Sequence, residues 1–265
     1  MEKGTPLEGL QVYERVVIFV AITVVGLGAS ILFDFPAAAL MILAVGAVTC
    51  IGTDYVLRAH PLMRFRPYRE SMAWWLLPAT LTVSACLFLR LLSDRYWPIA
   101  GLALTGLVLI GIWTAQYHLL DPDDEFARTA RQGVLLATYL TAFAALAAIY
   151  STKTRSLQTG SATFFVTTLL TYELLRSGRA NVSAARRGLY ALVIGLCLGE
   201  TIWALNYLAI GGLAGGAILL LTYYVLSGVT QEHLGGGISR GRALEYGAIS
   251  LLGLVMILSS RFLLG

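Results

Sequence analysis

The chain has 265 residues, of which 57% are hydrophobic and only 13% are charged, and its mean hydropathy is +0.75. A soluble domain carries roughly 25% charged residues, so this composition excludes a soluble globular enzyme and a soluble nucleic-acid-binding protein. The formal net charge of +4 is therefore interpreted as a signal of membrane topology. With the bilayer as solvent, long apolar runs are predicted to be α-helices, because a helix satisfies its own backbone hydrogen bonds.

Nine apolar runs follow one another along the chain, and at about 20 residues per span each predicts one transmembrane helix. The expected fold class is an all-α polytopic membrane bundle that forms a single transmembrane domain over residues 1–265. The runs are Val16–Phe33, Pro36–Leu57, Met72–Leu92, Trp97–Leu120, Gly133–Tyr150, Ser161–Leu175, Leu189–Leu208, Leu213–Val229 and Tyr246–Leu264.

The basic residues are distributed unequally between alternate connections. Five of the nineteen Lys and Arg residues fall on one side, namely Arg90, Arg95, Lys153, Arg155 and Arg261, and the other fourteen fall on the side of the N-terminus. Because cytoplasmic loops carry the excess of Lys and Arg, the N-terminus is predicted inside and the C-terminus outside a bacterial or archaeal cytoplasmic membrane. A missed or an extra span would spoil this alternation.

Similar residues recur at the predicted cytoplasmic ends of four runs. Thr53, Thr114, Thr171 and Thr222 each begin a short segment of Thr, Tyr and Leu, and an arginine-bearing connection follows. One interpretation is duplication of a two-helix unit, as in many transporters, with hairpins over 36–92, 97–150, 161–208 and 213–264. The alternative is that every cytoplasmic interface attracts aromatic and basic residues.

Glycines spaced four residues apart occur around the seventh and eighth runs. The pairs are Gly195 with Gly199, Gly211 with Gly215, and Gly212 with Gly216. Such spacing presents bare backbone on one helical face and predicts close helix packing in the membrane. The alternative is a hinge or the lining of a cavity.

Glu200 is the candidate for a functional acid inside the membrane. It lies eleven positions into the run Leu189–Leu208, and about 1.5 Å per residue places it roughly 16 Å deep, near the bilayer midplane. Trp203 and Tyr207 extend the same helical face, and Asn206 lies beside it.

No Lys, Arg or His lies at the depth of Glu200 in any predicted span, so this acid is expected to be buried without a countercharge and protonated part of the time. Such a residue indicates proton coupling, or a site for a cation or an amine. The alternative is a neutral Glu200 that is hydrogen-bonded to a Thr, Tyr or Asn on a neighbouring helix.

Polar residues gather near the predicted cytoplasmic helix ends. They predict a vestibule for an anionic lipid headgroup or a phosphate, with arginines as forked donors. Arg64, Arg66 and Arg69 are interpreted instead as topology anchors that rest on anionic lipid. The vestibule residues are Asp54, Arg58, His60, His118, Glu173, Arg176, Glu232 and His233.

The segment 121–125 is the one acidic cluster in the sequence, and His118 precedes it by one turn. Asp121, Asp123 and Asp124 are candidate ligands for Mg²⁺ bound to a diphosphate. The segment also fits a helix start, with Asp121 as N-cap and acids through the first turn. The three histidines lack the spacing of a zinc site, and no pattern indicates a cofactor.

Three functions are compatible with these features. The first is a transporter or channel-like carrier of a small solute or lipid, with Glu200 at the middle of a polar path. The second is a noncatalytic membrane subunit or scaffold that binds partner subunits or further copies of itself. The third is an enzyme that acts on a lipid-linked phosphate at the cytoplasmic leaflet and uses the acidic cluster.

Overall fold

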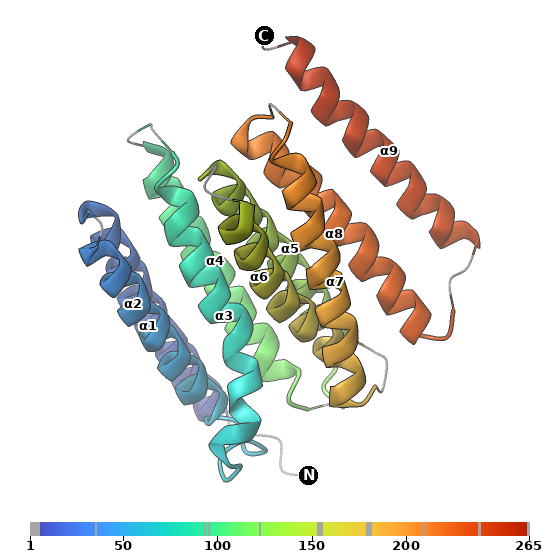
Figure 1. The fold of residues 1–265 in the computed structure, drawn as a ribbon. Helices are drawn as coiled ribbons and strands as arrows, with labels where there is room; N and C mark the ends of the chain where they lie inside the picture. Colours follow the sequence, from blue (N-terminus) through green and yellow to red (C-terminus); the bar gives the residue numbers. More distant parts are fainter. Residues whose placement is uncertain are drawn as a thin grey trace. The chain divides into compact units, whose positions relative to one another are not determined.

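The computed structural model describes residues 6–34, 36–92, 94, 96–121, 123–152, 156–178, 182–208, 210–237 and 240–263. In this part of the chain the elements are all α-helices (Figure 1). The helices are α1 (Pro6–Leu32), α2 (Ala37–Leu57), α3 (Tyr68–Leu89), α4 (Tyr96–His118), α5 (Ala127–Ser151), α6 (Ser156–Ser177), α7 (Ala184–Leu205), α8 (Gly212–Leu234) and α9 (Arg240–Leu263).

The predicted all-α fold with nine helices is confirmed, but the helix ends differ from the ends of the apolar runs. α7 begins at Ala184 and ends at Leu205, whereas the run was Leu189–Leu208. Its first turn is polar and starts at Ser183, whose hydroxyl accepts a hydrogen bond from the backbone N–H of Arg186 at 3.4 Å. α7 thus begins before its apolar run, at a start that a capping residue supports.

Seven of the described helices are long and apolar enough to cross a membrane, so the chain is a polytopic integral membrane protein. Of the nine predicted spans, these seven are supported by the structure. α6 has 22 residues but is more polar than these seven helices, because it carries five threonines besides Glu173 and Arg176. Much of α9 lies outside the part whose side chains are described, so its predicted span is not tested.

The chain divides into two compact units, residues 1–141 and residues 142–265. In the first unit α1 packs against α2 and α4, and α3 packs against α2 and α4. Leu27, Ile42, Val45 and Cys86 form a buried apolar cluster of this unit. Leu102 of α4 packs against this cluster, so four helices share one apolar core.

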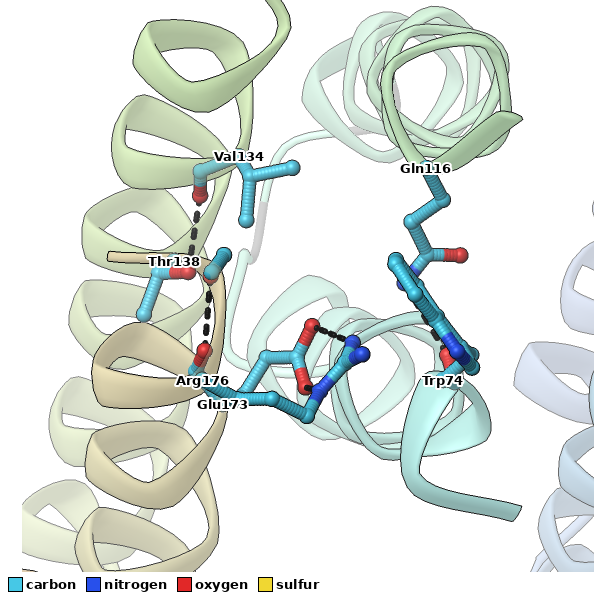
Figure 2. A network of polar contacts seen from close by, with 7 residues as sticks. Trp74, Gln116, Val134, Thr138, Glu173 and Arg176 are labelled. Atoms are coloured by element: carbon cyan, nitrogen blue, oxygen red, sulfur yellow. Dashed lines mark hydrogen bonds and ion pairs between the residues drawn. The ribbon is translucent and has the colours of Figure 1, made fainter. Parts of the chain in front are cut away.

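Polar bonds between helices also hold the first unit together. The indole Nε1 of Trp113 donates to the Thr53 hydroxyl at 2.9 Å, and the Gln116 amide donates to the Trp74 carbonyl at 3.0 Å (Figure 2). Each bond of this kind in a membrane contributes about 0.6 kcal/mol. Thr53, Thr171 and Thr222 all donate to carbonyls of their own helices, but only Thr53 of these three is shown to accept a bond from another helix. The structure does not show the predicted hairpin repeat.

In the second unit α6 and α7 pack along each other, α8 packs against α7, and α9 packs against α8 (Figure 1). A Cβ atom built on Gly199 would lie 3.2 Å from the Gly160 carbonyl oxygen of α6, and one built on Gly195 would lie 2.8 Å from the Phe164 carbonyl oxygen. The prediction that these glycines allow close packing is confirmed.

The glycines at the start of α8 pack against the end of α5. A Cβ atom built on Gly216 would lie 2.6 Å from both Cα and Cβ of Ala147, and one built on Gly215 would lie 2.1 Å from the Tyr150 ring. These contacts involve backbone atoms and a fully buried ring, which cannot move aside easily. The small residues therefore set the distance between the two helices.

We expect Gly216→Ala to lower the stability of the purified protein by about 1–3 kcal/mol, because the added methyl group overlaps the backbone of Ala147. Thermal unfolding in detergent measures this loss. Gly111→Ala in α4 is the matched control, since a Cβ atom there meets nothing within 4 Å. Equal melting temperatures for the two variants would contradict the packing role of Gly216.

Candidate functional site

Glu200 lies on an exposed face of α7. The helix ends five residues later at Leu205, so the carboxyl group lies about 8 Å from the C-terminal end of α7 at 1.5 Å per residue. One expectation is therefore corrected: the acid is not enclosed by the helices of its own unit. Its depth in the membrane stays a prediction.

The residues predicted to act with Glu200 do not form one enclosed site. Trp203, on the outward face of α7, is 55% exposed, and Tyr207, just after the helix ends, is 79% exposed. The amide of Asn206 turns instead toward α6 and donates to the Thr159 hydroxyl at 3.0 Å. Glu200, Trp203 and Tyr207 thus face outward, whereas Asn206 joins α7 to α6.

Among the vestibule residues of the first unit, Asp54 and Arg58 are already paired with each other. The Arg58 Nε donates to Asp54 at 2.6 Å, and its guanidinium lies 3.9 Å from the centroid of the Tyr68 ring. A further bond at 3.3 Å joins Arg58 to the carbonyl of Arg66. These contacts fix the connection between α2 and α3.

The acidic cluster stabilises the connection between α4 and α5. Asp124 accepts a hydrogen bond from the Phe126 N–H at 2.8 Å and lies 2.7 Å from Nδ1 of His118, and Asp121 accepts from the Asp123 N–H at 3.0 Å. The predicted helix start at Asp121 is wrong, because α5 begins at Ala127. The described residues hold no group of three His, Cys, Asp or Glu side chains arranged for a metal ion.

His60 lies beside this connection, with its ring 4.8 Å from that of Tyr117. Burial lowers the pKa of His60, although the charges of Asp121 and Asp124 oppose the shift. For Asp124, burial alone would raise the pKa, but hydrogen bonds from His118 and from the Phe126 N–H outweigh it and the pKa is lowered. The folded state therefore favours a neutral His60 beside an ionised Asp124.

In the second unit Glu173 and Arg176 form a forked ion pair one turn apart at the end of α6. The two nitrogen-to-oxygen distances are 2.8 Å and 2.6 Å, and the Glu173 side chain is 1% exposed (Figure 2). On α8, Glu232 pairs with Arg242, and the exposed His233 has its ring 6.2 Å from that of Tyr190. The eight vestibule residues thus belong to both units, and a single vestibule remains a prediction.

Two residues near the start of α7 were not among the predicted site residues. Arg187 was counted as a topology signal and Tyr190 was not considered, yet both lie within the contacts of α6, α7 and α8. Their spacing of three residues, which places them on one helical face, was the available signal.

Residues 17–260 match a family model described as "protein of unknown function (DUF5656)", so the chain belongs to this family. Neither the curated proteins nor the solved structures gave a match. The family assignment covers nearly all of the helices and adds no reaction or ligand.

We expect the stability of the protein to fall as the pH is lowered from about 7 to about 5. The pKa of His60 in the folded state lies below its ordinary value of 6.5, so the unfolded chain takes up the proton first and stability is lost through this range. The lowered pKa of Asp124 reduces the stability of the protein only when the pH falls below 3.8, the ordinary pKa of this group.

The test is thermal unfolding of the wild type and of His60→Asn across this pH range. Asparagine retains an acceptor for the Leu62 N–H, which bonds to His60 Nδ1 at 3.2 Å, but does not titrate. The variant should show a smaller loss of melting temperature on acidification. An equal pH dependence would show that His60 does not carry the effect.

Proposed function

We propose that this DUF5656 protein is a noncatalytic membrane subunit that binds another membrane protein through the outward face of α7. The observation that carries the proposal is the exposed carboxyl group of Glu200 within a membrane span. The exposed residues on this side of α7 include one acid and continue to Tyr207 just beyond the helix end: Leu189, Leu192, Val193, Leu196, Glu200, Trp203 and Tyr207.

An acid on a lipid-facing surface is unfavourable. Insertion measurements give about 2.5–3.5 kcal/mol for a charged residue such as Asp at the centre of a helix, and less toward its ends. Trp203 and Tyr207 fit the aromatic belt at a membrane surface and indicate no partner by themselves. Glu200 does indicate a partner, because a hydrogen-bond donor from a helix of another protein would offset the free-energy cost of exposing the acid to lipid.

The partner we infer is a different protein with a Lys, Arg or amide side chain in a transmembrane helix. In a pair of copies related by a twofold axis along the membrane normal at this face, the two Glu200 side chains would lie at the same depth, and two carboxylates that meet there repel each other. Charge complementarity therefore favours a partner that brings a donor.

The carrier hypothesis depended on an acid enclosed by the bundle, and the exposure of Glu200 removes that reason for preferring it. The lipid-phosphate enzyme depended on free carboxylates, whereas Asp121 and Asp124 accept backbone hydrogen bonds and Asp124 also pairs with His118. The inward position of the N-terminus stays part of the proposal, because it rests on the distribution of basic residues alone.

We expect Glu200→Lys to reduce the amount of complex recovered from native membranes in mild detergent by at least about tenfold. The lysine places a positive charge next to the partner's hydrogen-bond donor, and the two groups repel each other. Glu200→Gln should retain most of the complex, since its amide oxygen still accepts a hydrogen bond. Glu245→Lys reverses an exposed acid on α9 and is the matched control. Mass photometry of the purified tagged chain measures the recovery.

Two outcomes would contradict the proposal. A complex that survives Glu200→Lys unchanged would show that another face binds the partner. Solute or proton flux by the chain alone in liposomes, abolished by Glu200→Gln, would favour the carrier instead.

A further inference from the structure

Pro78 lies in the interior of α3, where a proline changes the backbone hydrogen bonding. Proline has no N–H group, so the carbonyl of Trp74, four residues earlier, loses the donor that an α-helix would give it. The proline ring also clashes with that carbonyl. A membrane helix tolerates such a residue where a neighbouring helix supplies a replacement partner. The backbone of α3 is therefore weakened between Trp74 and Pro78.

The replacement donor is the side chain of Gln116 on α4. Its Nε2 donates to the Trp74 carbonyl at 3.0 Å (Figure 2). Gln116 is completely buried, and no described residue donates to its shielded Oε1. A buried amide with one unpaired group is unfavourable by itself. The bond to α3 therefore explains this residue better than its own surroundings do.

Different bonds attach the two parts of α3 to neighbouring helices. On the C-terminal side of Pro78, the hydroxyl oxygen of Thr82 lies 3.2 Å from that of Thr49 on α2. On the N-terminal side, the bond from Gln116 attaches the helix to α4. Loss of one attachment therefore leaves the other in place.

We propose that α3 has a hinge at Pro78, and that the bond from Gln116 holds the N-terminal part of the helix, residues 68–77, against α4. When this bond breaks, no helical N–H replaces it, because residue 78 is a proline. Bending of a helix concentrates at a proline, and a hinge needs only a few residues that absorb the change in backbone angles.

The hinge also affects the connection between α2 and α3. Arg58 donates to the Arg66 carbonyl at 3.3 Å, and its guanidinium lies against the ring of Tyr68 at the start of α3. Movement of residues 68–77 therefore displaces this connection. The hinge is independent of the proposed partner binding, because all of its residues belong to the unit 1–141, whereas Glu200 belongs to the unit 142–265.

The test is hydrogen–deuterium exchange of the full-length protein in detergent, measured by mass spectrometry on peptides of α3. Gln116→Met removes the donor and keeps a side chain of similar length. It should speed the exchange of residues 72–77 about fivefold, the effect of one lost hydrogen bond, and leave the exchange of residues 83–89 unchanged.

Pro78→Ala provides the matched background, because it supplies an N–H for the Trp74 carbonyl and removes the ring. This variant alone should slow the exchange of residues 72–77 relative to the wild type. Addition of Gln116→Met to Pro78→Ala should have little further effect, since the carbonyl no longer depends on the glutamine.

Three outcomes would overturn the proposal. Equal acceleration of residues 72–77 and 83–89 in Gln116→Met would show that the bond supports the whole helix and that no hinge exists. Unchanged exchange would show that the bond does not hold residues 68–77. An effect of Gln116→Met that persists in full with Pro78→Ala would show that Gln116 does not act through the proline. If Gln116→Met is not recovered folded, Pro78→Ala carries the test, because equal or faster exchange of residues 72–77 in it contradicts the hinge.

Discussion

Satisfaction of polar groups within each helix is the constraint on which the rest of this structure depends, because the bilayer interior offers no hydrogen-bond partners. The threonines show how the sequence meets it. Thr49, Thr53 and Thr167 are fully buried, and each donates its hydroxyl hydrogen to the carbonyl four residues earlier. Polar residues therefore enter the core without requiring water, and some of them retain oxygen lone pairs for bonds between helices, as Thr53 does with Trp113.

Charged groups follow a related rule at the helix ends. Asp54 with Arg58 and Glu173 with Arg176 are neighbours on one helix, so each pair forms without help from another element. Glu200 departs from this rule, because it lies exposed on α7 and no described residue pairs with it. The proposed function comes from this departure, since the carboxyl group is left for a molecule outside the chain.

Hydropathy and small-residue spacing were sufficient to predict the number of helices and the close packing of Gly195, Gly199 and Gly216. They were insufficient for the site, because hydropathy does not fix the rotation of a helix about its own axis. Glu200 was therefore expected inside the bundle, whereas the structure exposes it on α7. The start of α5 was missed for a local reason, since Asp124 uses its oxygens in a turn before the helix begins.

The threonine content of α6 has a consequence for how this protein reaches the membrane. A helix with this composition has little tendency to leave the translocation channel for lipid by itself. Its backbone lies against the glycines of α7, which is more apolar and follows directly in the chain. If the two helices enter the lipid together as one hairpin, the apolar α7 compensates for the polar residues of α6. A defect in their contact would therefore appear during biosynthesis, as failed membrane integration and proteolysis.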